Sequence, residues 1–176
     1  MIAVRHGIAT RRLDLVPLRS ADADEMVAVL ADPRLYSFMG GGPPSRDTLS
    51  AMYKRQSVGR SSDGTEEWRN WIVRLRPTGV AIGFVQATIM KAGEVASIAW
   101  LIGVPWQGRG FAVDSARAVA SWLERRGVQT IVAHIRPDHH ASEAVAARAG
   151  LAPTGEIDQD GERIWRLMPA GSHAKD

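Results

Sequence analysis

Apolar and polar positions follow two different rhythms along this chain, and the change comes near residue 110. Between residues 68 and 102, apolar side chains recur at every second position, and this run is interrupted by turns at 77–79 and 91–93. Because the connections are too short for crossovers, three strands in an antiparallel meander are expected. Their predicted ranges are 68–76, 80–90 and 95–102.

The segment before the meander carries signals for one strand and two helices. Residues 11–18 alternate loosely and are expected to form a strand. Ser20 is expected to cap a helix that ends at the Asp-Pro pair of 32–33. After a loop rich in glycine and proline, Ser45 is expected to cap a second helix that runs to about residue 58.

Beyond Gly110 the apolar period becomes helical. One face collects the apolar positions of this helix, and Gly127 occupies the place of a helix-ending glycine. The face consists of Ala112, Ala116, Val119 and Leu123. A strand over 128–135, a short helix over 141–149 and a hairpin of 151–157 with 163–168 are expected to follow.

No linker or internal repeat divides the sequence, so one domain over 1–176 is predicted. Its ordered core is expected over about 9–168, with a flexible tail over 169–176. Strand runs and helical runs together predict an α/β (α+β) fold, in which helices flank a mixed, mostly antiparallel central sheet.

The composition excludes several kinds of site and of protein. The chain has no cysteine, which excludes disulfides, thiolate metal sites and cysteine nucleophiles. No apolar run approaches the ~20 residues of a membrane span, and the first residues lack the apolar core of a signal peptide, so a cytoplasmic protein is expected. The net charge is +3 and the arginines are scattered, which favours a solvated surface over a nucleic-acid site. The five histidines form no metal-ligand pattern, so no metal is expected.

The Gln-Gly-Arg-Gly-Phe-Ala run at 107–112 joins the meander to the first long helix. A glycine-rich turn that opens a helix presents unpaired backbone N–H groups, and the helix dipole there favours an anion. Gly108 and Gly110 let the main chain approach a pyrophosphate, and Arg109 adds a cation. Taken alone, two glycines in a tight turn are equally compatible with a purely steric role. A dinucleotide fingerprint would need a third glycine where Val113 stands, and a P-loop would need a Lys-Ser or Lys-Thr pair.

Residues 104–112 resemble the Gln/Arg-x-x-Gly-x-Gly/Ala signature of the GNAT acetyltransferase superfamily. Further blocks, in matching order, resemble its branch that acetylates ribosomal-protein N-termini. These blocks are residues 10–19, 31–33, 40–44, 98–101 and 137–142. The resemblance covers most of the chain and implies a single GNAT-like domain that uses acetyl-CoA to acetylate an amine.

The resemblance also implies the cofactor contacts. The coenzyme A pyrophosphate would lie on the amides of Gln107, Gly108, Arg109, Gly110, Phe111 and Ala112. The pantetheine arm would pair with the end of the preceding strand, at Ile102, Gly103 and Val104. An amide there would also face the thioester oxygen as an oxyanion donor.

The catalytic groups depart from the family pattern. Many members of the branch carry a glutamate where this chain has Ser97, which leaves the general base open. Glu94 is a weak candidate, because it would point to the opposite strand face. The others are Glu66, Glu67, His134 and His140.

For the general acid, the tyrosine of other branches is replaced by Ala146. Ser142 matches the serine of the ribosomal branch and could donate to the leaving thiolate, although a helix-start serine also bonds its own backbone. His139 replaces the asparagine that caps this helix and contacts the cofactor, so it is expected to cap, less well, or to touch pantetheine.

Two functions therefore stay open. The first is an acetyl-CoA-dependent N-acetyltransferase, monomeric or homodimeric, that acts on a protein N-terminus or a small-molecule amine. The second is a catalytically silent domain that binds coenzyme A as a sensor or scaffold. Asp63, Glu66 and Glu67 form the densest acidic group before the cofactor loop, and we expect them to steer a cationic amine.

Overall fold

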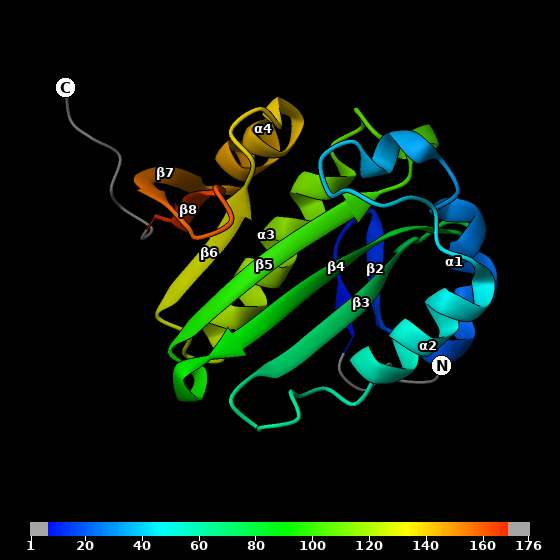
Figure 1. Ribbon diagram of the computed structural model, residues 1–176, viewed down its shortest axis with the longest axis horizontal. Coiled ribbons are helices and arrows are strands. Elements are labelled where there is room, and N and C mark those ends of the chain that lie inside the picture. Colours follow the sequence, from blue (N-terminus) through cyan, green and yellow to red (C-terminus); the bar gives the residue numbers. More distant parts are fainter. Residues whose placement is uncertain (1–6, 169–176) are drawn as a thin grey trace.

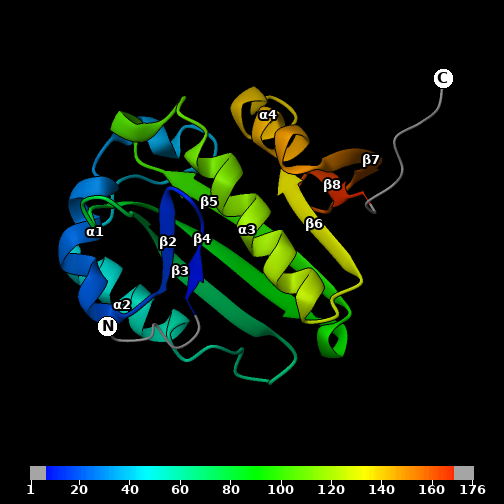
Figure 2. The ribbon, with the colours of Figure 1, turned by 180° about the vertical axis from the view of Figure 1, so that it is seen from behind.

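The computed structural model describes residues 7–168 and shows one eight-stranded sheet with helices on both faces (Figures 1 and 2). The strand order is β1-β2-β3-β4-β5-β6-β8-β7. The strands are β1 (Ile8–Ala9), β2 (Leu13–Pro17), β3 (Glu67–Leu75), β4 (Ala81–Met90), β5 (Val95–Ile102), β6 (Thr130–Ile135), β7 (Leu151–Ile157) and β8 (Arg163–Leu167). The helices are α1 (Ala23–Val29), α2 (Arg46–Gln56), α3 (Phe111–Arg125) and α4 (His140–Ala149).

The antiparallel meander and the closing hairpin are confirmed. β3 pairs with β4 and β4 with β5, both antiparallel, and β7 pairs with β8. Among the described strands the one parallel pair is β5 with β6, and α3 makes the connection between them. The mixed, mostly antiparallel α/β class is therefore correct. Strand β1 was missed, because two residues are too few to show a period.

The first helix differs from the prediction. Ser20 does not cap it; a 3-10 turn over Ser20–Asp22 comes first, and the Asp22 carboxylate accepts a 2.7 Å bond from the Arg19 N–H. The helix also ends early, at Val29. By contrast, Ser45 caps α2 as predicted and accepts from the Thr48 N–H at 3.1 Å. The predicted flexible tail at 169–176 lies outside the described residues.

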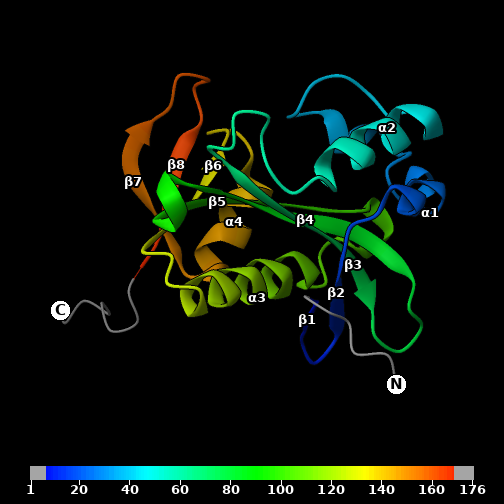
Figure 3. The same cartoon turned by 90° about the horizontal axis from the view of Figure 1, so that it is seen from below.

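The sheet separates two apolar clusters, one on each face. The view from below shows α1 and α2 on one side of the sheet and α3 on the other (Figure 3). Even-numbered residues of β5, such as Ile98 and Ile102, belong to the cluster that packs under α3 and α4. Leu101 packs in the other cluster, under α1 and α2. Gly83 permits the close pairing of β4 with β5, because an added Cβ would lie 2.1 Å from the Leu101 carbonyl oxygen.

Candidate active site

The central feature of the site is a gap between β5 and β6, which part from each other in Figure 1. The two strands pair over only three positions, from Val95 with Thr130 to Ser97 with Val132. Strand β5 then continues to Ile102 without a partner on that side. A stretch of strand edge is therefore available to pair with an extended ligand.

Alternation along β5 decides which groups face the gap. The Gly103 N–H donates to the Ile82 carbonyl at 2.8 Å, so it points towards β4. Because successive residues of a strand point their N–H and C=O groups to opposite neighbours, Trp100 and Ile102 point theirs to the side of the gap. There the Ile102 carbonyl accepts from the Gln107 Nε2 at 2.9 Å. Of the three positions expected to meet pantetheine, Gly103 thus has its amide already bonded to β4, whereas the amide of Ile102 faces the gap.

The loop after β5 ends at the N-terminus of α3. Gly108 and Gly110 have φ angles of +72° and +79°, a left-handed conformation that glycine adopts without strain. Within residues 7–168, the backbone N–H groups from Gly108 to Val113 have no hydrogen-bond acceptor. Six unpaired donors at the start of a 15-residue helix form a site for an anion such as a pyrophosphate.

An arginine from outside the loop holds it in place. The Arg12 Nε donates to Asp114 at 2.8 Å, and its Nη1 donates to the Arg109 carbonyl at 3.0 Å. Its guanidinium also lies over the Phe111 ring, 4.7 Å from the centroid, and the Arg109 guanidinium lies 5.0 Å from the same ring. Arg12 thus ties the strand region to the loop and to the first turn of α3. Sequence patterns gave no sign of this, because the partners lie about a hundred residues away.

The start of α4 carries a linked histidine and serine. The His139 side chain accepts a 3.3 Å bond from the Ser142 N–H through Nδ1, so His139 caps the helix as expected. Burial lowers the pKa of His139, so the ring is neutral at pH 7. With Nδ1 accepting, the proton sits on Nε2, which lies 3.3 Å from the Ser142 Oγ. The Ser142 hydroxyl is then free to donate elsewhere. Phe38 stacks on His139 at 4.0 Å and brings the α1–α2 connection against α4.

A cavity of about 690 Å³ opens on the α1–α2 face of the sheet. The side chains of Trp68, Asn70, Gln86 and Thr88 from β3 and β4 line it, and Thr88 pairs in register with Ser97 of β5. Arg55 and Arg60 line it as well, and neither has an ion-pair partner among the described residues. None of the described residues that line this cavity is acidic.

The three loop acids do not gather at the cavity, contrary to expectation. Asp63 is occupied within its own loop, where bonds from Ser61 and Thr65 lower its pKa to about 2. Glu66 accepts from the Trp68 indole at 2.8 Å. Glu67 pairs with Arg126 at the end of α3, on the other face of the sheet.

Most of the base candidates also lie away from the gap. Glu94 is exposed at the start of β5, where its carbonyl accepts from Gln129 and Thr130, so it lies at the end of the β5–β6 pair opposite the gap. His140 is 85% exposed and pairs with Glu143. His134 alone of the candidates lies on β6 beyond its last pairing with β5.

Comparison with known proteins decides the family. The model of the acetyltransferase (GNAT) domain matches residues 12–152, which is most of the chain. The chain belongs to the GNAT acetyltransferase family. None of the curated proteins matches the sequence.

Solved structures agree on the fold of this GNAT domain. RimL, a ribosomal L7/L12 α-N-protein acetyltransferase in complex with coenzyme A, has a TM-score of 0.79 at 18% identity, with 93% of this chain and 98% of that chain covered. A GNAT acetyltransferase from Bacillus anthracis has a TM-score of 0.77 at 14% identity, covering 92% and 98%. AAC(6')-Ib with paromomycin and acetyl-CoA has a TM-score of 0.74 at 17% identity, covering 93% and 99%. Across residues 7–168, no helix is long and apolar enough to cross a membrane.

Proposed function

We propose that this GNAT domain binds acetyl-CoA and transfers the acetyl group to a primary amine by direct attack on the thioester. The observation that carries the proposal is the gap between β5 and β6 beside a row of unpaired loop amides. An extended pantetheine arm fits the free edge of β5, and the amides from Gly108 to Val113 fit a pyrophosphate. No metal is needed, because fixed backbone dipoles supply the positive field.

The start of α4 supplies the group that protonates the thiolate. With Nε2 of His139 donating to its oxygen, the Ser142 hydroxyl keeps its own proton for the sulfur. The amide of Ile102 is our candidate for the oxyanion donor, since it faces the gap. Ser97 and Ala146 depart from the family's catalytic pattern, so a coenzyme A-binding domain without turnover is the alternative.

The cavity on the α1–α2 face fits the acceptor. Arg55 and Arg60, which have no ion-pair partner within residues 7–168, favour an amine that also carries a carboxylate or a phosphate over a polycation. A peptide N-terminus with an acidic side chain and a small amino acid both meet this description. We further propose that the chain acts in the cytoplasm, where acetyl-CoA is available, as a monomer or homodimer.

The proposal is tested by adding charge to the loop at Gly108. Asp and Asn both tolerate a positive φ, and an added Cβ there meets no atom within 4 Å, so Gly108→Asp and Gly108→Asn should both fold. A carboxylate about 6 Å from a phosphate costs ~1–3 kcal/mol per charge pair at an effective dielectric between ~80 and ~20. Coenzyme A affinity in Gly108→Asp should therefore fall by about 10- to 100-fold.

Titration calorimetry with coenzyme A measures this effect, and Gly108→Asn is the matched control without charge. Equal affinity in the two variants would show that the loop does not hold the phosphates. Turnover of acetyl-CoA against a panel of primary amines then separates the enzyme from the silent domain, because only the enzyme releases free thiol in step with the amine consumed.

A further inference from the structure

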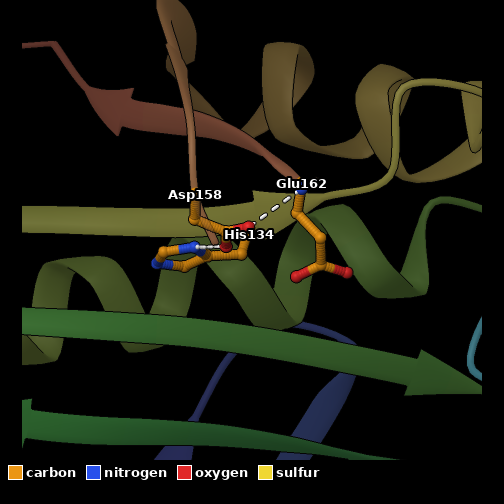
Figure 4. A group of neighbouring side chains, drawn as sticks. All are labelled: His134, Asp158 and Glu162. Atoms are coloured by element: carbon orange, nitrogen blue, oxygen red, sulfur yellow. Dashed lines mark hydrogen bonds and ion pairs between the residues drawn. The ribbon is translucent and has the colours of Figure 1, made fainter. Parts of the chain in front are cut away.

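A histidine of β6 and a carboxylate of the β7–β8 turn face each other (Figure 4). The His134 Nδ1 lies 2.6 Å from the Asp158 Oδ2. His134 is on β6, two residues beyond Val132, the last residue that pairs with β5. Because Val132 and Ser97 are paired, and alternate residues share a face, His134 lies on the face of Ser97. This is the face on which an acceptor would meet the thioester.

Asp158 is held rigidly in the turn between β7 and β8. Its Oδ1 accepts from the N–H groups of Asp160 and Glu162, both at 2.9 Å. The N–H of Glu162 contributes most to lowering the pKa of Asp158, and the bond from His134 adds to it, so the carboxylate is ionised at neutral pH. An ionised carboxylate only accepts, so the proton of the neutral imidazole lies on Nδ1.

The other ring nitrogen is available for chemistry. Nε2 of His134 carries the lone pair in this tautomer, and it has no hydrogen-bond partner in the described part of the chain. The His134 side chain is 32% exposed, which leaves a route to solvent for a proton. The imidazole is thus oriented by one carboxylate and open on its basic side, the arrangement that a general base requires.

The other groups near the His134 ring do not change the assignment of its proton to Nδ1. Besides Asp158, the only carboxylate grouped with His134 in the described chain is that of Glu162, with its nearest oxygen within 4.8 Å. On the same face of β8, Ile164 lies opposite His134, and Arg166 forms an ion pair with Glu156.

We propose that His134 is the general base of the acetyl transfer and that Asp158 is its positioning residue; this rests on the proposed function. Nε2 takes one proton from the acceptor ammonium, and the freed lone pair forms the N–C bond to the thioester carbon. The C–S bond then breaks, and the second proton of the attacking nitrogen ends on the thiolate by way of Ser142. His134 returns the first proton to solvent, so one amide, one thiol and one proton are produced.

A cation held by the same three side chains is the competing use of the cluster. Both oxygens of Asp158 are already occupied, Oδ2 by the imidazole and Oδ1 by two backbone N–H groups. A metal held between Nδ1 and Oδ2 would have to displace the bond that joins these atoms and remove the proton from Nδ1. The hydrogen-bond pattern therefore favours a general base over a metal site at this cluster.

Substitution of each member of the pair tests the proposal. His134→Gln should lower kcat/KM for the amine by about 10²- to 10⁴-fold, the usual contribution of a general base. The acidic limb of its pH profile should move up to the pKa of the amine itself, so that higher pH restores part of the rate by supplying free amine. Asp158→Asn should lower kcat with a smaller change in KM. It should shift the acidic limb of the pH profile without removing it. His140→Gln, which removes the exposed His140–Glu143 pair, is the matched control and should leave all of these unchanged.

Coenzyme A affinity and thermal unfolding of each variant show that the fold and the cofactor site persist. Wild-type rate and pH profile in His134→Gln would overturn the base and leave the proposed function standing. Loss of activity with EDTA and its return with zinc would overturn the base in favour of a metal. A wild-type chain that binds coenzyme A but acetylates no amine in the panel would overturn both proposals.

Discussion

Removing the clamp that Arg12 places on the cofactor loop should weaken coenzyme A binding without unfolding the chain. The Arg12 side chain is 36% exposed, so its ion pair with Asp114 contributes only ~0.2–1 kcal/mol. The bond to the Arg109 carbonyl is charge-assisted, and after the same discount for solvent we assign it about 1 kcal/mol. Together the two contacts stabilise the ordered loop by ~1–2 kcal/mol, which corresponds to about 5- to 30-fold in affinity for coenzyme A.

Three variants separate the possible causes of such a loss. Arg12→Gln removes the clamp and a charge, and Arg11→Gln removes a charge from the exposed neighbouring residue. Arg12→Lys keeps the charge, but one ammonium on a flexible stem cannot replace the planar fork that reaches Asp114 and the Arg109 carbonyl together.

In calorimetry, the affinity for coenzyme A should depend on whether the variant keeps the Arg12 contacts to the loop, and not on how many charges it has lost. Arg11→Gln should bind like the wild type, while Arg12→Gln and Arg12→Lys should both bind more weakly. If Arg12→Lys recovers full affinity, Arg12 acts only as a cation. If Arg12→Gln binds like Arg11→Gln, the loop needs no clamp and the argument fails.

Two further outcomes follow from the site. Ser142→Ala should lower kcat by about 10- to 100-fold when chemistry limits turnover, because a hydrogen bond to a charged group contributes ~1.5–3 kcal/mol; single-turnover kinetics checks this, and an unchanged rate would restrict Ser142 to the start of α4. Gln substitutions at Arg55 and Arg60 should raise KM several-fold for amines that carry a carboxylate while leaving KM for acetyl-CoA unchanged. Steady-state kinetics with a carboxylated amine and its amide is the comparison, and equal effects on both amines would exclude recognition of the acid group.

Local patterns determined most of the fold. Alternation in the meander and the 3.6-residue period beyond Gly110 specify strand and helix directly, because each depends on which side of one element is buried. Glycines at 108 and 110 mark the loop for the same reason, since their positive φ angles are a local requirement. The first helix was predicted too long, because Ser20 resembles a cap while the backbone forms a 3-10 turn there.

The family signature and the loop amides were also within reach of the sequence. Cofactor contacts through backbone N–H groups depend on the loop conformation and hardly on side chains, so the motif predicts them even where side chains differ. The order of residues in the chain predicts Ser142 and His139 at the start of the last helix, whereas their bond to each other follows only from the three-dimensional structure.

Only the tertiary structure decided which polar groups meet. His134 and Asp158 are 24 residues apart, and the Asp-Gln-Asp-Gly turn was recognised only as a hairpin signal. They meet because β8 lies between β6 and β7 in the sheet, which returns the turn to the side of β6. The acids at 63, 66 and 67 are close in sequence and yet face different partners. Asp63 is bonded within its own turn, while Glu66, next to β3, and Glu67, its first residue, point to opposite faces. Residues that are close in sequence determine where helices and strands form. The order of the strands in the sheet, and the face to which each side chain points, determine which polar groups meet at the site.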